Sequence, residues 1–226
     1  MQLARRLKLT FGMITLIIAP FLAAQDGVRV ELLKGDAVTP YIKDITELSL
    51  IIYKEYPYLY EGTEEEYRPF IEHYASSQNG IACLLFDNEK PVGVAIGMPM
   101  NEMREKYQQP LLNVNPKIDF DSLFYLGEFL LLQEYRGQGF GKEMYLELEQ
   151  AVRKEGYFEK ICFCKIEEFD QHPLKPNNYK PLDKFWKKFG FKQCENLNFT
   201  VFWRDVFENE DSPHQMIYYM KRLSDQ

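Results

Sequence analysis

The stretch Arg136-Gly137-Gln138-Gly139-Phe140-Gly141-Lys142 separates an apolar run, residues 127–132, from a segment with helical periodicity. Its three alternating glycines leave the start of the helix without side chains, so backbone N–H groups can point outward. The helix dipole adds positive potential there, and Arg136 and Lys142 add a cation at either end. A plain tight turn rarely needs three alternating glycines between two cations. The stretch therefore predicts a binding site for phosphate groups.

Two well-known phosphate-binding motifs do not fit this turn. The ATP-type P-loop, GxxxxGK(S/T), needs a glycine where Arg136 stands and a hydroxyl residue where Glu143 stands. The dinucleotide pattern GxGxxG needs a glycine at the position of Lys142. What remains is the pattern Arg-x-x-Gly-x-Gly, which Arg136, Gly139 and Gly141 form.

Hydrophobic periodicity on both sides of the turn predicts one α/β domain over residues 28–226, in which helices alternate with strands. Thr63 and Glu66 form a capping-box pattern at the start of one helix. The stretch from Pro99 to Asp121 is expected to be irregular. Together the elements predict a mixed sheet with helices on its faces. The expected strands cover residues 28–33, 81–86, 92–98, 123–132, 160–166, 198–203 and 215–221, and the other expected helices cover residues 39–54, 139–155 and 183–189.

The composition excludes several classes of protein. Apolar residues make up 46% of the chain, which is ample for a packed core and excludes a disordered chain. The formal net charge of -7 argues against a nucleic-acid partner, because such a protein presents a basic face to the phosphates. The cysteines form no CxxC pair and the histidines have no ligand-like spacing, so we expect no metal site. Cys162 and Cys164 should share one face of a strand as core residues.

The glycine turn and a later segment together resemble the GNAT superfamily of N-acetyltransferases. Arg136, Gly139 and Gly141 match the family hallmark (Gln or Arg)-x-x-Gly-x-(Gly or Ala), which follows the fourth strand. The segment Phe185-Trp186-Lys187-Lys188-Phe189-Gly190-Phe191 is similar to a second family signature, about 50 residues further on. The resemblance implies a mixed, mostly antiparallel central sheet flanked by helices. It also implies acetyl-CoA as cosubstrate and the direct transfer of its acetyl group to an amine.

The resemblance further implies which residues bind the cofactor. Backbone groups of Leu130, Leu131 and Leu132 would pair with the pantetheine arm as if it were an extra strand. Trp186 would pack against the same arm. The pyrophosphate would be held by the turn, that is by Arg136, Gly137, Gln138, Gly139, Phe140, Gly141 and Lys142.

Glu128 is the candidate general base for the acceptor amine. It is the only ionisable residue inside the predicted central strand, and burial would raise its pKa toward neutrality. The structural alternative is that Glu128 only binds a partner side chain or faces solvent. Many family members carry a tyrosine that protonates the leaving thiolate at the position of Trp186. Because an indole N–H is no useful proton source, we expect Tyr179 to take this role, unless the thiolate leaves without help.

The acceptor site is expected among the first helices, the loop between them and the late strands. Tyrosines of residues 53–60 and the acids Glu61, Glu64, Glu65 and Glu66 would form a cation-binding lip there. A solvated acidic helix start is the structural alternative. The predicted activity is acetyl transfer to a primary amine on a small molecule, peptide or protein, by a monomer or homodimer. The alternative is a catalytically impaired acyl-CoA-binding protein with the same fold.

The N-terminal residues 1–27 are expected to form a hydrophobic extension outside the domain. Arg5, Arg6 and Lys8 precede an uncharged, mostly apolar run over residues 9–24, a pattern typical of a secretory signal. That run is short for a membrane span, but contact with a membrane through it is possible. The other interpretation is a plain extension of a cytoplasmic domain. An enzyme that uses acetyl-CoA needs a compartment that contains it, which favours the cytoplasm.

Overall fold

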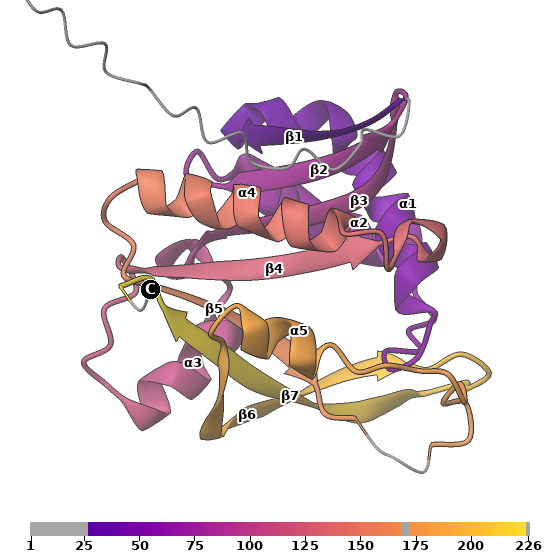
Figure 1. Ribbon diagram of the computed structural model, residues 1–226. Coiled ribbons are helices and arrows are strands. Elements are labelled where there is room, and N and C mark those ends of the chain that lie inside the picture. Colours follow the sequence, from indigo (N-terminus) through magenta and orange to yellow (C-terminus); the bar gives the residue numbers. More distant parts are fainter. Residues whose placement is uncertain (1–26, 169–171, 225–226) are drawn as a thin grey trace, which may run out of the picture.

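The computed structural model describes residues 27–168 and 172–224, and in this part of the chain seven strands form one sheet. The strand order is β1-β2-β3-β4-β5-β7-β6 (Figure 1). Only β4 and β5 are parallel, so the mostly antiparallel sheet that the family resemblance implied is confirmed. The strands are β1 Val28–Lys34, β2 Ile81–Asp87, β3 Lys90–Pro99, β4 Leu123–Leu131, β5 Lys160–Ile166, β6 Lys192–Arg204 and β7 Asp211–Arg222.

Helices cover both faces of the sheet and enclose two apolar cores (Figure 1). Helices α1, α2 and α3 lie on one face, where Ile45, Ile71 and Leu111 are buried against the sheet. Helices α4 and α5 lie on the other face, where Tyr145 and Trp186 are buried. The helices are α1 Ile42–Tyr53, α2 Glu64–Ser76, α3 Glu105–Val114, α4 Phe140–Lys154 and α5 Asp183–Lys188.

The predicted elements occur in the predicted order, but α3 was not predicted, and β6 and β7 begin earlier than expected, β7 at Asp211 rather than at Gln215. The stretch expected to be irregular contains α3, which has Pro110 inside it and buries only Leu111, so its helical period was too weak to detect. Strand β6 begins at Lys192 rather than near Asn198, because a register shift at its start interrupts the apolar alternation. Cys162 and Cys164 do pack against the same core, as predicted.

Strands β4 and β5 separate soon after they meet. They pair over only three positions, from Leu123 opposite Lys160 to Tyr125 opposite Cys162. Beyond Tyr125, β4 stays paired with β3 on one side, and β5 stays paired with β7 on its far side. The inner edges of β4 and β5 therefore face each other without forming a ladder.

A bulge at Gly127 lies where this separation begins. Ile96 of β3 is opposite Glu128 and Gly97 is opposite Leu126, so Gly127 is the extra residue of β4. Before the bulge Leu126 packs on the α4 side of the sheet, and after it Phe129 does. In a regular strand residues 126 and 128 would share a face. The bulge instead turns Glu128 toward α1 and α2.

The described part of the chain contains no helix that is long and apolar enough to cross a membrane. The apolar run over residues 9–24, for which membrane contact was considered, lies outside the described residues.

Replacing Gly127 with alanine should destabilise the protein by about 1–3 kcal/mol, because the new methyl group has no room. A Cβ at this position would lie 2.0 Å from Tyr74 Oη and 2.2 Å from Tyr74 Cζ, whereas one at Gly141 would lie 3.7 Å from its nearest neighbour. Urea denaturation of Gly127→Ala and of the control Gly141→Ala measures the difference. Equal stability of the two variants would show that Tyr74 does not press against the bulge.

Candidate active site

Glu128 lies on the face of the sheet that α1 and α2 cover, and it is 5% exposed. Both of its carboxylate oxygens accept hydrogen bonds from phenols. Tyr53 at the end of α1 donates to Oε2, and Tyr67 of α2 donates to Oε1 over 2.7 Å. Glu128 therefore does pair with neighbouring side chains, as its structural alternative stated. It is also a buried acid next to the point where β4 and β5 separate.

The pKa of Glu128 is raised from the ordinary value of 4.5 to about 7. Burial is the main cause, because the low-polarity surroundings disfavour the charged carboxylate. The hydrogen bonds from Tyr53 and Tyr67 oppose this rise, since phenol donors stabilise the carboxylate form. An acid with a pKa near neutrality exchanges its proton readily at physiological pH, which suits a general base.

Three half-buried tyrosines surround this carboxylate. The rings of Tyr53 and Tyr58 meet edge to face at 4.6 Å, and those of Tyr53 and Tyr67 lie 5.6 Å apart. Burial is the largest cause that raises the pKa of each phenol, and the charge of Glu128 is the second. The three tyrosines are thus largely enclosed but keep some exposed surface. Tyr67 was not predicted, because its position in an amphipathic helix gives no signal of function.

The loop between α1 and α2 is fixed to the end of β6. Trp203 Nε1 donates to the carbonyl oxygen of Tyr58 over 3.0 Å, and Val206 N donates to Leu59 O over 2.6 Å. The Trp203 ring stacks on His214 at 3.7 Å. Ser212 and Asp205 both contact Nε2 of His214, so one ring nitrogen serves both and no Ser-His-Asp relay exists here. This cluster therefore supports the loop.

The glycine turn has the backbone that the sequence indicated. Gly137 and Gly139 have positive φ angles of 77° and 97°, a region that residues with a Cβ rarely adopt. Gly139 is the N-cap of α4 and no side chain caps the helix, so the first N–H groups remain available to an anion. Arg136 lies beside this turn, with its Nη1 2.7 Å from Glu55 Oε2. The side chain of Lys142 is exposed at the start of the helix.

The backbone groups of the predicted pantetheine strand divide between the two edges of β4. Leu132 N donates to Val92 O of β3 over 3.0 Å, so Leu132 and, by alternation, Leu130 face β3. Leu131 faces the inner edge instead, where its carbonyl oxygen accepts a bond of 2.7 Å from Arg136 Nε. Of the three leucines, Leu131 is therefore the one whose backbone groups face the gap between β4 and β5.

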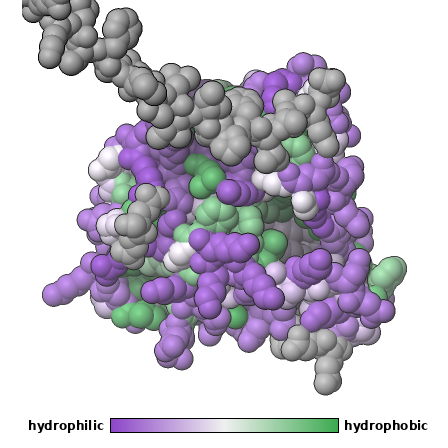
Figure 2. Space-filling view, viewed as in Figure 1, coloured by the Kyte–Doolittle hydropathy of each residue, from purple (hydrophilic) through white to green (hydrophobic). Residues whose placement is uncertain are grey.

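Trp186 is 4% exposed and lies within the core on the α4 side of the sheet. Its indole contacts the rings of Phe129, Phe163 and Phe191. Trp186 thus packs against Phe129, whose side chain lies on the α4 side of β4. On this face Figure 2 shows apolar surface in a hollow rimmed by polar side chains, where Figure 1 shows β4 between α4 and α5.

Tyr179 is half-buried and stands edge-on to Tyr56 at 4.7 Å. Burial is the largest cause that raises the pKa of Tyr179, and the negative charge of Glu168 raises it further. Glu168 in turn pairs with Lys165 at 2.8 Å. The charge of Glu128 is not among the main causes of the raised pKa of Tyr179, although it is the second cause for Tyr58.

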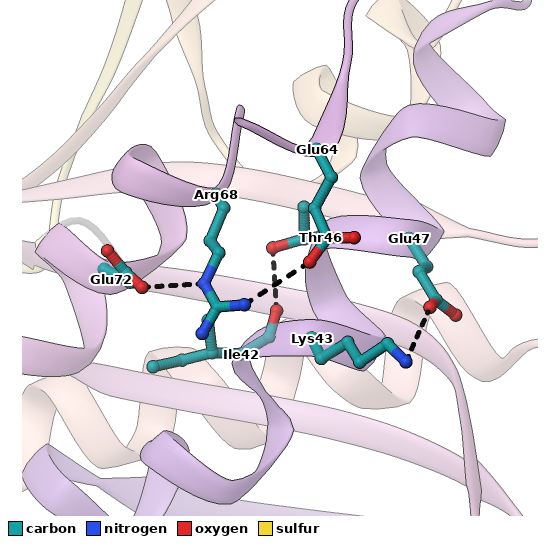
Figure 3. Close-up of polar contacts among 7 residues, drawn as sticks. All are labelled: Ile42, Lys43, Thr46, Glu47, Glu64, Arg68 and Glu72. Atoms are coloured by element: carbon teal, nitrogen blue, oxygen red, sulfur yellow. Dashed lines mark hydrogen bonds and ion pairs between the residues drawn. The ribbon is translucent and has the colours of Figure 1, made fainter. Parts of the chain in front are cut away.

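The acids at the start of α2 have structural partners. Glu66 accepts from the backbone N–H of Thr63, and Thr63 caps Glu66 in return, so the predicted capping box is confirmed. Arg68 lies between Glu64 and Glu72 on one side of α2 (Figure 3). Glu61 pairs with Lys54 at 2.8 Å. These contacts favour the solvated helix start over a cation-binding lip.

Two adjoining hollows of about 470 and 270 Å³ lie where β5 begins, and Lys160 and Arg222 line both. Neither hollow includes Glu128 or the glycine turn, so the candidate site is defined by the separated strands and not by these hollows. Within residues 27–168 and 172–224, no group of His, Cys, Asp or Glu side chains is arranged to hold a metal ion.

Comparison with known proteins identifies one family. A model described as the acetyltransferase (GNAT) family matches residues 45–191, well over half of the chain. The match contains both Glu128 and the glycine turn. No curated protein sequence matches the chain significantly.

Solved structures with the same fold have low sequence identity to this chain. A GNAT-family acetyltransferase from Staphylococcus aureus Mu50 has a TM-score of 0.54 at 14% identity, over 87% of this chain and 100% of that one. Arabidopsis thaliana NAA60, in complex with a bisubstrate analogue, gives 0.55 at 12%, over 88% and 100%. An aminoglycoside 6'-N-acetyltransferase complexed with coenzyme A gives 0.53 at 13%, over 87% and 98%. At these identities the likeness shows the fold alone.

The raised pKa of Glu128 predicts a pH-dependent stability that Glu128→Gln should lack. Between the ordinary pKa of 4.5 and the folded value of about 7, the folded protein holds a proton that the unfolded chain has lost. Stability should therefore fall as pH rises through this window, by about 3 kcal/mol relative to Glu128→Gln. Urea denaturation of both proteins from pH 4.5 to 8 measures it. A constant difference between them would mean that Glu128 titrates normally.

Proposed function

We propose that this chain, which belongs to the acetyltransferase (GNAT) family, transfers the acetyl group of acetyl-CoA to a primary amine by direct attack. The observation that carries the proposal is the position of Glu128, a buried acid with a pKa of about 7 beside the unpaired edge of β4. The glycine turn lies at the end of the same strand. A cofactor that spans both would bring its thioester near this acid.

The coenzyme A pyrophosphate is assigned to the turn from Arg136 to Lys142. The uncapped start of α4 and the positive φ of Gly137 and Gly139 support this assignment, because they direct backbone N–H groups at an anion. Arg136 and Lys142 supply positive charge. The pantetheine arm is assigned to the inner edge of β4 at Leu131, where a bound arm would replace the Arg136 guanidinium on the Leu131 carbonyl. Trp186 supports that edge from the core.

Glu128 is assigned the role of general base. An acceptor amine arrives mostly protonated at neutral pH and must lose a proton before or during attack on the thioester carbonyl. Two phenols compete for the role of proton donor to the leaving thiolate. Tyr179 is favoured because it lies near Trp186 in the sequence. Tyr58 is favoured because the charge of Glu128 raises its pKa, whereas that charge is not among the main causes for Tyr179.

The acceptor class is proposed as a primary amine on a small molecule, a peptide or a protein. Solved structures of similar fold include an aminoglycoside acetyltransferase and a ribosomal-protein-S18-alanine N-acetyltransferase from Escherichia coli, so the fold serves both kinds of acceptor. The half-buried tyrosines near Glu128 would suit an amine, since aromatic faces attract cations. Because acetyl-CoA is required, we assign the activity to the cytoplasm, in a monomer or homodimer.

Wild-type protein should release free thiol from acetyl-CoA when supplied with an amine from a panel of polyamines, aminoglycosides and peptides. Glu128→Gln should lower kcat by about 100-fold, because it keeps the shape of the side chain but cannot accept a proton. A thiol-reactive dye measures turnover, and calorimetry measures coenzyme A binding. Binding without turnover for every amine would support instead the impaired acyl-CoA-binding protein, and normal turnover in Glu128→Gln would exclude Glu128 as the base.

Gly137→Ala should weaken coenzyme A binding about tenfold, since a side chain at positive φ costs about 1–2 kcal/mol and would shift the turn. Gly156→Ala is the matched control. Both glycines have φ +77° and open space at the Cβ position, but Gly156 follows the other end of α4. The two variants should lose similar stability in thermal denaturation, while calorimetry should find weaker binding for Gly137→Ala alone. Equal affinities would remove the turn from the binding site.

A further inference from the structure

We propose that Arg136 and Glu55 form a gate that selects acetyl donors carrying a pyrophosphate, an inference that rests on the proposed acetyl transfer. The Arg136 side chain lies on the inner edge of β4, where the pantetheine arm is expected to bind, and Glu55 holds it there. The pair therefore determines the class of donor, which is a complete coenzyme A ester and not a shorter pantetheine ester.

The guanidinium of Arg136 makes two hydrogen bonds that connect two parts of the fold. Its Nε donates to the carbonyl oxygen of Leu131 over 2.7 Å, and its Nη1 donates to Glu55 Oε2 over 2.7 Å. Leu131 ends β4, whereas Glu55 belongs to the loop between α1 and α2. Because the donors of a guanidinium have a rigid planar arrangement, both bonds together fix its position.

The backbone around Glu55 places its carboxylate beside the guanidinium. Glu55 N donates to Ile52 O over 3.0 Å, and Glu55 O accepts from Tyr58 N over 3.1 Å, so the turn after α1 is closed on both sides of this residue. The neighbouring cation Lys54 pairs with Glu61 at 2.8 Å. Lys54 thus has its own partner, and the Glu55 carboxylate pairs with the guanidinium.

A pantetheine arm on this edge needs the position of the guanidinium. Leu132 N donates to Val92 O of β3, so by alternation Leu131 presents its backbone groups to the inner edge. A strand added to an edge brings its N–H groups to about 2.9 Å from such a carbonyl oxygen. Arg136 Nε already stands at that distance from the Leu131 oxygen. Arg136 must therefore move away when the arm binds, and both of its hydrogen bonds are lost.

A pyrophosphate compensates for the two lost bonds. Arg136 directly precedes Gly137, the first glycine of the turn, so its guanidinium can bind an anion held there. Two phosphate groups offer more charge and more acceptor oxygens than one carboxylate, and arginine binds phosphate well. A donor without the pyrophosphate must break the same bonds and supplies no new partner. The gate therefore lowers the affinity for short donors, whereas a complete coenzyme A ester recovers the loss.

The gate is exposed enough to open. The side chains of Arg136 and Glu55 are 40% and 37% exposed, so water can solvate both groups when they separate. Ion pairs at this exposure contribute little to stability. The pair between Lys221 and Glu149 is different, because its side chains are 7% and 6% exposed and breaking it would leave buried charges. The first pair is suited to exchange of partners, and the second is suited to a fixed structure.

The test compares the binding of coenzyme A with that of pantetheine, which lacks the pyrophosphate, to the full-length protein. Arg136→Gln should raise the Kd of coenzyme A about tenfold and lower the Kd of pantetheine about threefold, because it removes a phosphate partner and also opens the gate. Calorimetry measures coenzyme A, and a ligand-observed NMR titration measures pantetheine. Lys43→Gln, which removes an exposed cation paired with Glu47 on α1 (Figure 3), is the matched control and should change neither Kd.

Glu55→Gln tests the other half of the gate. It should lower the Kd of both ligands about threefold, because the guanidinium loses the charge that holds it on the edge. Pantetheine is uncharged, so a general loss of negative charge would not produce this effect. When combined with Arg136→Gln, the same substitution should have no further effect. Glu47→Gln, which breaks an exposed ion pair on α1, is the control and should leave both values unchanged.

Several outcomes would overturn the gate. Weaker binding of both ligands to Arg136→Gln would make Arg136 an ordinary cofactor contact, and unchanged pantetheine binding would mean that the arm does not displace it. If pantetheine binds the wild type too weakly to titrate, coenzyme A decides: an equal Kd in the wild type and Glu55→Gln overturns the gate. A wild type that binds coenzyme A but acetylates no amine would refute the proposed transfer alone, and one that does not bind it would refute both.

Discussion

The extra residue at Gly127 in β4 is the constraint on which the geometry of the candidate site depends. A bulge increases local twist and bends the strand, and here it stands just beyond the last residue of β4 that pairs with β5. Because Gly127 is one extra residue, each side chain after it points to the opposite face of the sheet from the one it would occupy in a regular strand. Only glycine fits, because the Tyr74 hydroxyl occupies the space that a Cβ would need. Strand separation and the direction of Glu128 therefore have one origin.

Separation leaves strand edges whose backbone groups need partners, and on β4 a side chain of the protein provides one. The Arg136 guanidinium bonds to the Leu131 carbonyl. Buried backbone polar groups without a partner cost free energy, so this contact stabilises the opened sheet. An extended ligand arm can exchange its own amides for the Arg136 contact.

The electrostatics of the site follow from burial more than from net charge. The chain carries a formal charge of -7, yet the acids at the start of α2 serve as caps or pair with Lys54 and Arg68. Glu128 differs because its partners are neutral phenols, which stabilise the carboxylate less than a cation would. Its pKa therefore remains near 7. A cation in place of Tyr53 or Tyr67 would lower the pKa and weaken the base.

The sequence by itself determined the order of the elements apart from α3, the glycine turn and the family. These depend on local periodicity and on residues close together in the chain, such as the glycines that permit positive φ at positions 137 and 139. It also singled out Glu128, the only ionisable residue inside the predicted central strand. Only the tertiary structure decided what Glu128 contacts, since Tyr53 and Tyr67 are 75 and 61 residues away. The direction of Glu128 likewise depends on a one-residue shift that only the packing of both faces can fix.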